Sequence, residues 1–339
     1  MTTTLDTIGD GTRTVTGNDR VREIVKRQEV TLIAVILVFG TIITIINPVF
    51  ATPANLIDLL RSTVVYFVAA CGLTLVVVAG GFDFSVGSTF TLGGISAAWL
   101  MTIGVPWPVA ILAGIALGCL VGFVNSVIID RLDVPPIITT LGMFYFVAGA
   151  VVIFTGGRDI QPLPAGFNAF GKGTLLGVPV LIWYAIVIGI VFHIVLQRTR
   201  FGYNVKAVGG NLNAAVANGI SKNRTNAWLY AVAGGIAALA GILYAARTGS
   251  GQVSAGGASL TLTAISAVLI GGTSLFGGVG TIAGTALGAL LFATINNGLA
   301  IASVPAQFSN MIIGAILVIA VALDAYRRKR SLLSRFRSR

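Results

Sequence analysis

The sequence predicts an all-α polytopic membrane protein with about ten transmembrane helices and glycine-rich breaks. Of its 339 residues 55% are hydrophobic and only 10% are charged, whereas a soluble chain carries about 25% charged residues. The apolar residues form blocks of about 20, the length that a helix needs to cross a bilayer. Membrane β-barrel strands would instead alternate apolar and polar positions. The 43 glycines indicate close helix packing, because small residues let helices approach each other in lipid.

The apolar blocks divide the chain into spans and tails. We expect a flexible tail at 1–29, a single transmembrane domain at 30–325 with a cytoplasmic loop at about 198–226, and a basic tail at 326–339. The expected spans are 30–47, 57–80, 87–103, 107–129, 136–155, 179–197, 227–246, 260–272, 281–301 and 308–325.

The distribution of charge predicts the orientation. The chain has a net charge of +11, and with a cytoplasmic N-terminus these spans place 18 of the 22 lysines and arginines inside. This bias satisfies the positive-inside rule and puts both termini in the cytoplasm. The basic residues lie in clusters beside the membrane, which fits contact with the lipid bilayer rather than binding of nucleic acid.

The stretch "AGGFDFSVGS" follows the second span and holds Gly80, Gly81, Asp83 and Ser85. A glycine pair permits a helix break, and irregular backbone at membrane depth is tolerated only inside protein or beside a wet cavity. An ionised aspartate there costs about 2.5–3.5 kcal/mol. That cost is offset if Asp83 caps the next helix by accepting from the amides of Ser85 or Val86. A purely structural cap and a part in gating or in the transport path both stay open.

A related stretch, "IGGTSLFGGVGT", lies near the C-terminus. Aligned without gaps, Gly271 and Gly272 fall on the first glycine pair and Ser274 falls on Asp83. Such interruptions in the two halves of a transporter point to its central pathway. Asn125 and Asn296 are polar residues within spans, for which helix-to-helix hydrogen bonding is the alternative role. The candidate path residues are Gly80, Gly81, Asp83, Ser85, Asn125, Gly271, Gly272, Thr273, Ser274 and Asn296.

The longest cytoplasmic loop contains "NLNAAVANGIS", which predicts a short amphipathic helix. Asn211 is a suitable N-cap and Gly219 lies near the end of the segment. A helix this short has too little apolar surface to be stable alone, so we expect it to dock on another surface. A connector lying on the membrane surface is the alternative.

Several chemical functions are disfavoured. "GFNAFGKGT" approximates a phosphate-binding loop, but Gly173 occupies the required Ser/Thr position and no strand precedes the segment. No catalytic set and no metal-ligand cluster stands in the spans, so we expect neither an enzyme nor a bound metal or cofactor. An ion-coupled secondary transporter would normally need intramembrane carboxylates or histidines, and Asp83 alone is a thin basis for one.

Four motifs resemble a known family: "GGFDFSVGS", "RTRFGYNVKAVGGNLNAAVANGI", "AISAVLIGGTSLFGGVGTIAGTALGALL" and "NNGLAIASVPAQFSNMIIGAILVIAVALD". In this order they resemble the permease subunits of bacterial ribose-type sugar ABC importers, and the resemblance runs from about Pro48 to Asp324. It implies a multi-pass inner-membrane protein with ten spans, paired with a second copy or a close paralogue. It also implies a cytoplasmic ATPase subunit with two nucleotide-binding domains, which uses ATP and magnesium, and a periplasmic sugar-binding protein.

The resemblance implies import of a pentose, a hexose or a related polyol, with no catalysis by this chain. Branched-chain amino-acid permeases are a related family and form the alternative. In this frame the ATPase contacts would come from Arg200, Phe201, Gly202, Gly210, Asn211, Ala214, Ala215, Gly219 and Ile220. One departure stands out, because Thr261 and Thr263 occupy positions that are usually acidic in such permeases.

Overall fold

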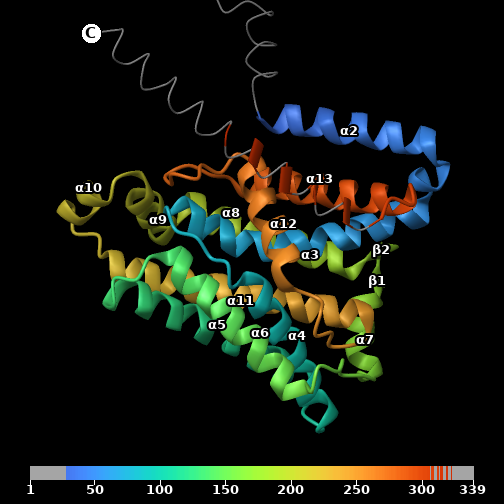
Figure 1. The fold of residues 1–339 in the computed structure, drawn as a ribbon, viewed down its shortest axis with the longest axis horizontal. Coiled ribbons are helices and arrows are strands. Elements are labelled where there is room, and N and C mark those ends of the chain that lie inside the picture. Colours follow the sequence, from blue (N-terminus) through green and yellow to red (C-terminus); the bar gives the residue numbers. More distant parts are fainter. Residues whose placement is uncertain are drawn as a thin grey trace, which may run out of the picture.

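The computed structural model describes residues 28–305, 307–308, 311–312, 314–315, 318–319 and 322. Its long helices lie side by side, with α3 and α11 in the middle of the bundle (Figure 1). The helices are α2 (Gln28–Ile46), η1 (Pro48–Ala51), α3 (Pro53–Val78), α4 (Val86–Thr102), α5 (Trp107–Arg131), α6 (Pro136–Thr155), α7 (Ala165–Lys172), α8 (Val180–Arg198), α9 (Arg200–Gly210), α10 (Leu212–Ala217), α11 (Lys222–Thr248), α12 (Gly257–Ile270) and α13 (Ile282–Ile301). The strands β1 (Thr174–Leu175) and β2 (Val178–Pro179) form an antiparallel hairpin.

Nine of the ten predicted spans coincide with helices in this part of the chain. Most of the tenth, with residues 1–27 and the basic tail, lies outside the described residues. Seven of the described helices are long and apolar enough to cross a membrane. The predicted spans at 87–103 and 260–272 correspond to α4 and α12, which have 17 and 14 residues. At about 1.5 Å per residue they are shorter than a hydrocarbon core of about 30 Å, so each needs additional chain to cross.

The two ends of the bundle carry different elements. In Figure 1, α9 and α10 lie at the left end, whereas α7 and the β1–β2 hairpin lie at the right end. The segment between the fifth and sixth predicted spans forms α7 and the β1–β2 hairpin. Within it, Phe167 of α7 is fully buried, and an isolated bridge joins Ile160 to Gly251. Most of the segment that approximated a phosphate-binding loop is the helix α7.

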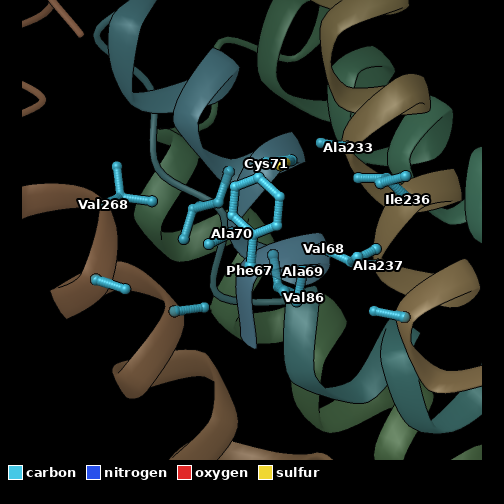
Figure 2. Packing of buried hydrophobic residues seen from close by; sticks show 14 of the residues in the cluster. Phe67, Val68, Ala69, Ala70, Cys71, Val86, Ala233, Ile236, Ala237 and Val268 are labelled. Carbon is cyan, nitrogen blue, oxygen red and sulfur yellow. The ribbon is translucent and has the colours of Figure 1, made fainter. Parts of the chain in front are cut away.

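The core lies between α3, α11 and α12. Almost every residue of α3 from Val64 to Val78 is buried. Figure 2 shows Phe67 to Cys71 of α3 beside Ala233, Ile236 and Ala237 of α11 and Val268 of α12. α3 is thus enclosed by protein on several sides, which makes it the central helix of the bundle.

Glycines bring several helix backbones into direct contact. A Cβ atom on Gly241 of α11 would collide with the carbonyl oxygen of Phe90 in α4. Gly118 of α5 and Gly234 of α11 face each other in the same way. Backbone contact of this kind allows dispersion forces to hold helices together in lipid, where no hydrophobic force acts between them.

We therefore expect Gly241→Ala to destabilise the protein by about 1–3 kcal/mol, because two backbones must move apart. The matched control is Gly142→Ala in α6, where an added Cβ meets nothing within 4 Å. Thermal unfolding of the purified protein in detergent measures both variants. An equal melting temperature for the two variants would show that the α4–α11 contact is not tight.

Candidate functional site

The connection between α3 and α4 is a non-helical stretch that enters the bundle. α3 ends at Val78. Gly80, two residues later, has φ +80°, and the amides of Gly80 and Gly81 donate to the carbonyls of Val77 and Val76. The chain then runs from the end that carries α9 toward the middle of the molecule, where α4 begins (Figure 1). Residues 81–85 are called the buried break below. The sequence predicted a break here, and the structure shows that it leads inward rather than around a surface corner.

Side chains from two long helices bind the backbone of the buried break. Thr140 Oγ1 of α6 accepts a hydrogen bond of 3.0 Å from the amide of Phe84. The Tyr230 hydroxyl of α11 donates to the carbonyl of Phe82 over 3.2 Å. These bonds replace the helical bonds that the segment lacks, because an unpaired backbone group away from water is costly.

Thr261 of α12 binds the start of α4. Its Oγ1 accepts from the amide of Gly87 at 3.0 Å. Its own proton has two acceptors within reach, the carbonyl of Gly257 at 3.0 Å and that of Phe84 at 3.4 Å. Thr261 is 2% exposed, so its hydroxyl serves an amide of the first turn of α4 that has no partner within its own helix. The position that is unusual in the family resemblance thus has a structural role at the buried break.

Asp83 and Ser85 form a hydrogen-bonded pair inside the protein. Asp83 Oδ1 accepts from the Ser85 amide at 2.8 Å and from Ser85 Oγ at 2.5 Å, and Asn125 of α5 donates to Ser85 Oγ at 3.0 Å. The predicted bond from the Ser85 amide is therefore present. The N-cap residue of α4, however, is Ser85 rather than Asp83. Asp83 is 1% exposed, so protein, not lipid, surrounds its carboxyl group.

Five of the predicted path residues thus come together at the buried break: Gly80, Gly81, Asp83, Ser85 and Asn125. Tyr230 and Thr261 complete the cluster, and neither residue was predicted to lie at the buried break. No local pattern marks them, because each lies more than 140 residues from its partner along the chain. Thr140 was likewise not among the predicted path residues.

The second glycine-rich stretch forms a comparable turn. The amides of Gly272 and Thr273 donate to the carbonyls of Leu269 and Val268, so α12 ends in the same way as α3. Phe276 donates its amide to Ser274 Oγ at 3.3 Å, as Ser85 does to Asp83. The left-handed glycine is Gly272 with φ +93°, one position later than a gapless alignment with Gly80 predicts. Gly271 packs against Gly284 of α13.

The two turns meet the end of α9 in a cluster that we call the glycine junction, formed by Gly80, Gly209, Gly277 and Gly278. The amide of Gly278 donates to the carbonyl of Val78 over 2.7 Å. A Cβ on Gly209 would collide with the same carbonyl, and one on Gly277 would lie 2.7 Å from the Gly209 carbonyl oxygen and 3.0 Å from the Gly80 nitrogen. Backbone therefore touches backbone between α9 and both turns.

α9 begins directly after α8 and was not predicted. Thr199 caps it by accepting from the amide of Gly202, and a Cβ on Gly202 would collide with the carbonyl of Val195. Arg200 and Phe201 form its first turn. Only the later helix was predicted, although the 11 residues of α9 are amphipathic and pack on α8.

α10 agrees with the predicted short helix. Asn211 follows Gly210 and caps α10 by accepting from the amide of Ala214 at 3.1 Å. Beyond it Gly219 has φ +80°, and Ile220 donates its amide to the carbonyl of Ala215. Tyr203 of α9 and Val216 of α10 are 76% and 54% exposed. These two helices thus present apolar side chains at one end of the bundle.

Asn296 lies apart from the buried break. It is on α13, beside Tyr66 of α3. The neighbouring Asn297 exchanges two hydrogen bonds with Asn55 of α3, at 2.8 and 3.0 Å. Hydrogen bonding between helices, the alternative role for such residues, is what the structure shows at Asn297.

Asp83 provides a test of the buried break. Asp83→Ala leaves the buried amide of Ser85 without an acceptor, so we expect a loss of about 1–3 kcal/mol of stability. Asp83→Asn keeps an oxygen at the same place and should cost less. Thermal unfolding of both variants in detergent measures this difference. An alanine variant as stable as the asparagine variant would contradict the proposed hydrogen-bonding role.

Adjacent glycines provide a test of the glycine junction. Gly209→Ala forces a Cβ against the α3 turn, whereas a Cβ on Gly210 meets nothing within 4 Å. We expect Gly209→Ala to lower the melting temperature and Gly210→Ala to leave it nearly unchanged, since both are helical glycines with similar intrinsic preferences. If both substitutions are equally tolerated, the junction is not closely packed.

Comparisons with known proteins assign the family. Residues 55–321 match the family model described as "Branched-chain amino acid transport system / permease component". The chain is 38% identical to the ribose import permease of Escherichia coli (strain K12), over 92% of this chain and 98% of that protein. It is 36% identical to the ribose import permease of Bacillus subtilis (strain 168), over 86% and 89%.

A further relative is the autoinducer 2 import system permease of Salmonella paratyphi A, 35% identical over 86% of this chain and 88% of that protein. No solved structure matches the chain. The family model and these relatives each cover most of the sequence and agree with the four motifs. The chain belongs to the ribose-type permease family of ABC importers.

Proposed function

We propose that this chain is the membrane subunit of an ATP-driven importer that carries a neutral sugar or polyol across the bacterial inner membrane. The family and the names of its relatives support the class of transporter. The glycine junction is the observation that carries the mechanism. Because α9 touches both glycine-rich turns through backbone atoms, a displacement of α9 reaches the buried break directly.

The partner at the α9–α10 end is a cytoplasmic ATPase subunit with two nucleotide-binding domains, which binds the ATP and magnesium. Tyr203 and Val216 supply the apolar contact surface on α9 and α10. The positive-inside bias supports a cytoplasmic location for this end and for both termini. The α7 end then faces the periplasm and receives the sugar-binding protein.

A complete transporter contains a second permease, either another copy of this chain or a close paralogue, and each copy crosses the membrane ten times. For α4 and α12 the crossing includes non-helical chain. α4 is preceded by the buried break, and α12 follows residues 249–256, which pass along α4 with Gly251 against Ala98 and Gly256 against Gly87. Each crossing is therefore completed by non-helical chain that packs against neighbouring helices, as lipid requires.

A neutral substrate fits the buried break better than an amino acid does. A zwitterionic amino acid needs one cationic and one anionic partner. The acid at the buried break is Asp83. Its Oδ1 already accepts two hydrogen bonds from Ser85, so this oxygen is occupied and does not serve as the anionic partner of an ammonium group. Branched-chain amino acids stay as the second candidate, because the matching family model carries that name.

Cross-linking tests the docking surface. Ala214→Cys in α10 should cross-link to the ATPase in inner-membrane vesicles, in a Cys119→Ser background that removes a partly exposed thiol. Leu176→Cys is the control, because Leu176 is exposed in the hairpin at the opposite end. Cross-linking of the control alone, or of neither variant, would contradict the assignment.

Transport by the purified protein tests the energy source. Proteoliposomes containing the permease, the ATPase and the binding protein should accumulate a sugar only with ATP. Uptake of leucine but not of any pentose or hexose would favour the second candidate. Uptake driven by an ion gradient without the ATPase would identify a secondary transporter instead.

A further inference from the structure

A polar cavity of about 260 Å³ lies between α3, α11 and the start of α12, toward the end of the bundle that carries α7. None of its lining residues was among the path residues predicted from the sequence. The polar side chains that line it are Ser62, Tyr66, Tyr244, Arg247, Ser254 and Ser259. We propose that this cavity binds the transported sugar after the sugar leaves the binding protein. This inference rests on the proposed function and names a site for its substrate.

The polar groups of the cavity are held in place by neighbouring side chains. Arg247 donates from Nη1 to Ser62 Oγ at 3.0 Å. The hydroxyl of Tyr244 donates to Gln252 Oε1 at 3.1 Å. A guanidinium group has five N–H donors in a rigid plane, so Arg247 keeps donors for a ligand after serving Ser62. The site is therefore organised before a ligand enters.

The chemistry of the lining fits an uncharged polyol. Sugar hydroxyls both donate and accept hydrogen bonds, and the serines, tyrosines and Arg247 offer both kinds of partner. The rings of Tyr66 and Tyr244 supply apolar surface for the C–H groups of a sugar. No carboxylate is among the lining residues in the described part of the chain, so the ammonium group of an amino acid would lack a partner.

The volume of the cavity fits one small molecule. Its volume of about 260 Å³ lies just below the roughly 300–1,000 Å³ of typical small-molecule pockets. A single sugar ring with its hydroxyls occupies space of this order.

The wall of the cavity is continuous with the buried break. Gly256 lines the cavity, and a Cβ on Gly256 would collide with the carbonyl of Gly87. Gly87 lies in the first turn of α4, two residues after Ser85. A single backbone contact thus separates the cavity from the buried break, and a shift of the break changes the inner wall of the cavity. The proposed substrate site therefore lies next to the buried break, to which α9 is linked through the glycine junction.

Ligand protection of a cysteine tests the site without measuring transport. Ser259→Cys lies in the wall of the cavity and is accessible, and Leu176→Cys in the exposed hairpin is its control. The full complex in proteoliposomes is labelled with a water-soluble maleimide, with and without the sugar that the wild-type complex transports. At twice its dissociation constant the sugar should slow labelling of Ser259→Cys about threefold, since one third of the sites stay free. Labelling of Leu176→Cys should not change.

Arg247→Gln and Tyr244→Phe test the chemistry of the site. Arg247→Gln should abolish the protection of Ser259→Cys and reduce the transport rate about tenfold. Tyr244→Phe keeps the shape of the ring and should weaken protection without unfolding the protein. Arg158→Gln is the matched control, because Arg158 is an exposed arginine of the α6–α7 connection that does not line the cavity; it should keep protection and a transport rate within about twofold of wild type.

The outcomes separate the two proposals. If the wild-type complex transports no sugar and no polyol, the proposed function fails and the site fails with it. If it transports a sugar that neither protects Ser259→Cys nor depends on Arg247 and Tyr244, the proposed function stands and the cavity is not the substrate site.

Discussion

The arrangement of this protein depends on one constraint: between Gly81 and Ser85 the chain passes through the helix bundle, and the amides of Phe84 and Ser85 and the carbonyl of Phe82 have side chains rather than helical groups as partners. Each such group left unpaired would cost about 1–3 kcal/mol. Side chains of α5, α6, α11 and α12 bind the segment or the start of α4, through Asn125, Thr140, Tyr230 and Thr261. The same bonds fix where these four helices lie relative to α3 and α4. The hydrogen bonds that pair the backbone of the break therefore also hold the helices of the bundle in place.

Close backbone contact follows from this arrangement. α4 and α12 begin beside each other, and both are short because non-helical chain precedes each of them. At the other end of the break, Gly80 meets Gly209 and the second glycine-rich turn. Movement at the end of α9 therefore meets backbone atoms rather than flexible side chains. Rigid contact of this kind suits a transporter in which a movement at one end must change the conformation of the interior.

Much of the fold could be predicted from the sequence, because a membrane helix is marked by continuous apolar residues. The glycine pair predicted the break, and the bond between Asp83 and Ser85 was predictable because the residues are two apart. Partners that are distant along the chain were not predictable: nothing near Tyr230 or Thr261 indicates what each binds. The polar cavity was missed for the same reason, since Tyr66, Arg247 and Ser259 come from three helices. α4 and α12 were taken as full spans because hydropathy does not show where a helix begins.

Hydrogen exchange at the buried break tests the account most directly. Peptides that cover residues 81–88 of the protein in lipid nanodiscs are compared with peptides from α3 and from the β1–β2 hairpin. If side chains bind this backbone as described, the amides of Phe84, Ser85 and Gly87 exchange nearly as slowly as those of α3. Exchange as fast as in the exposed hairpin would mean that the segment is solvated and not held by its neighbours, which would contradict the central claim.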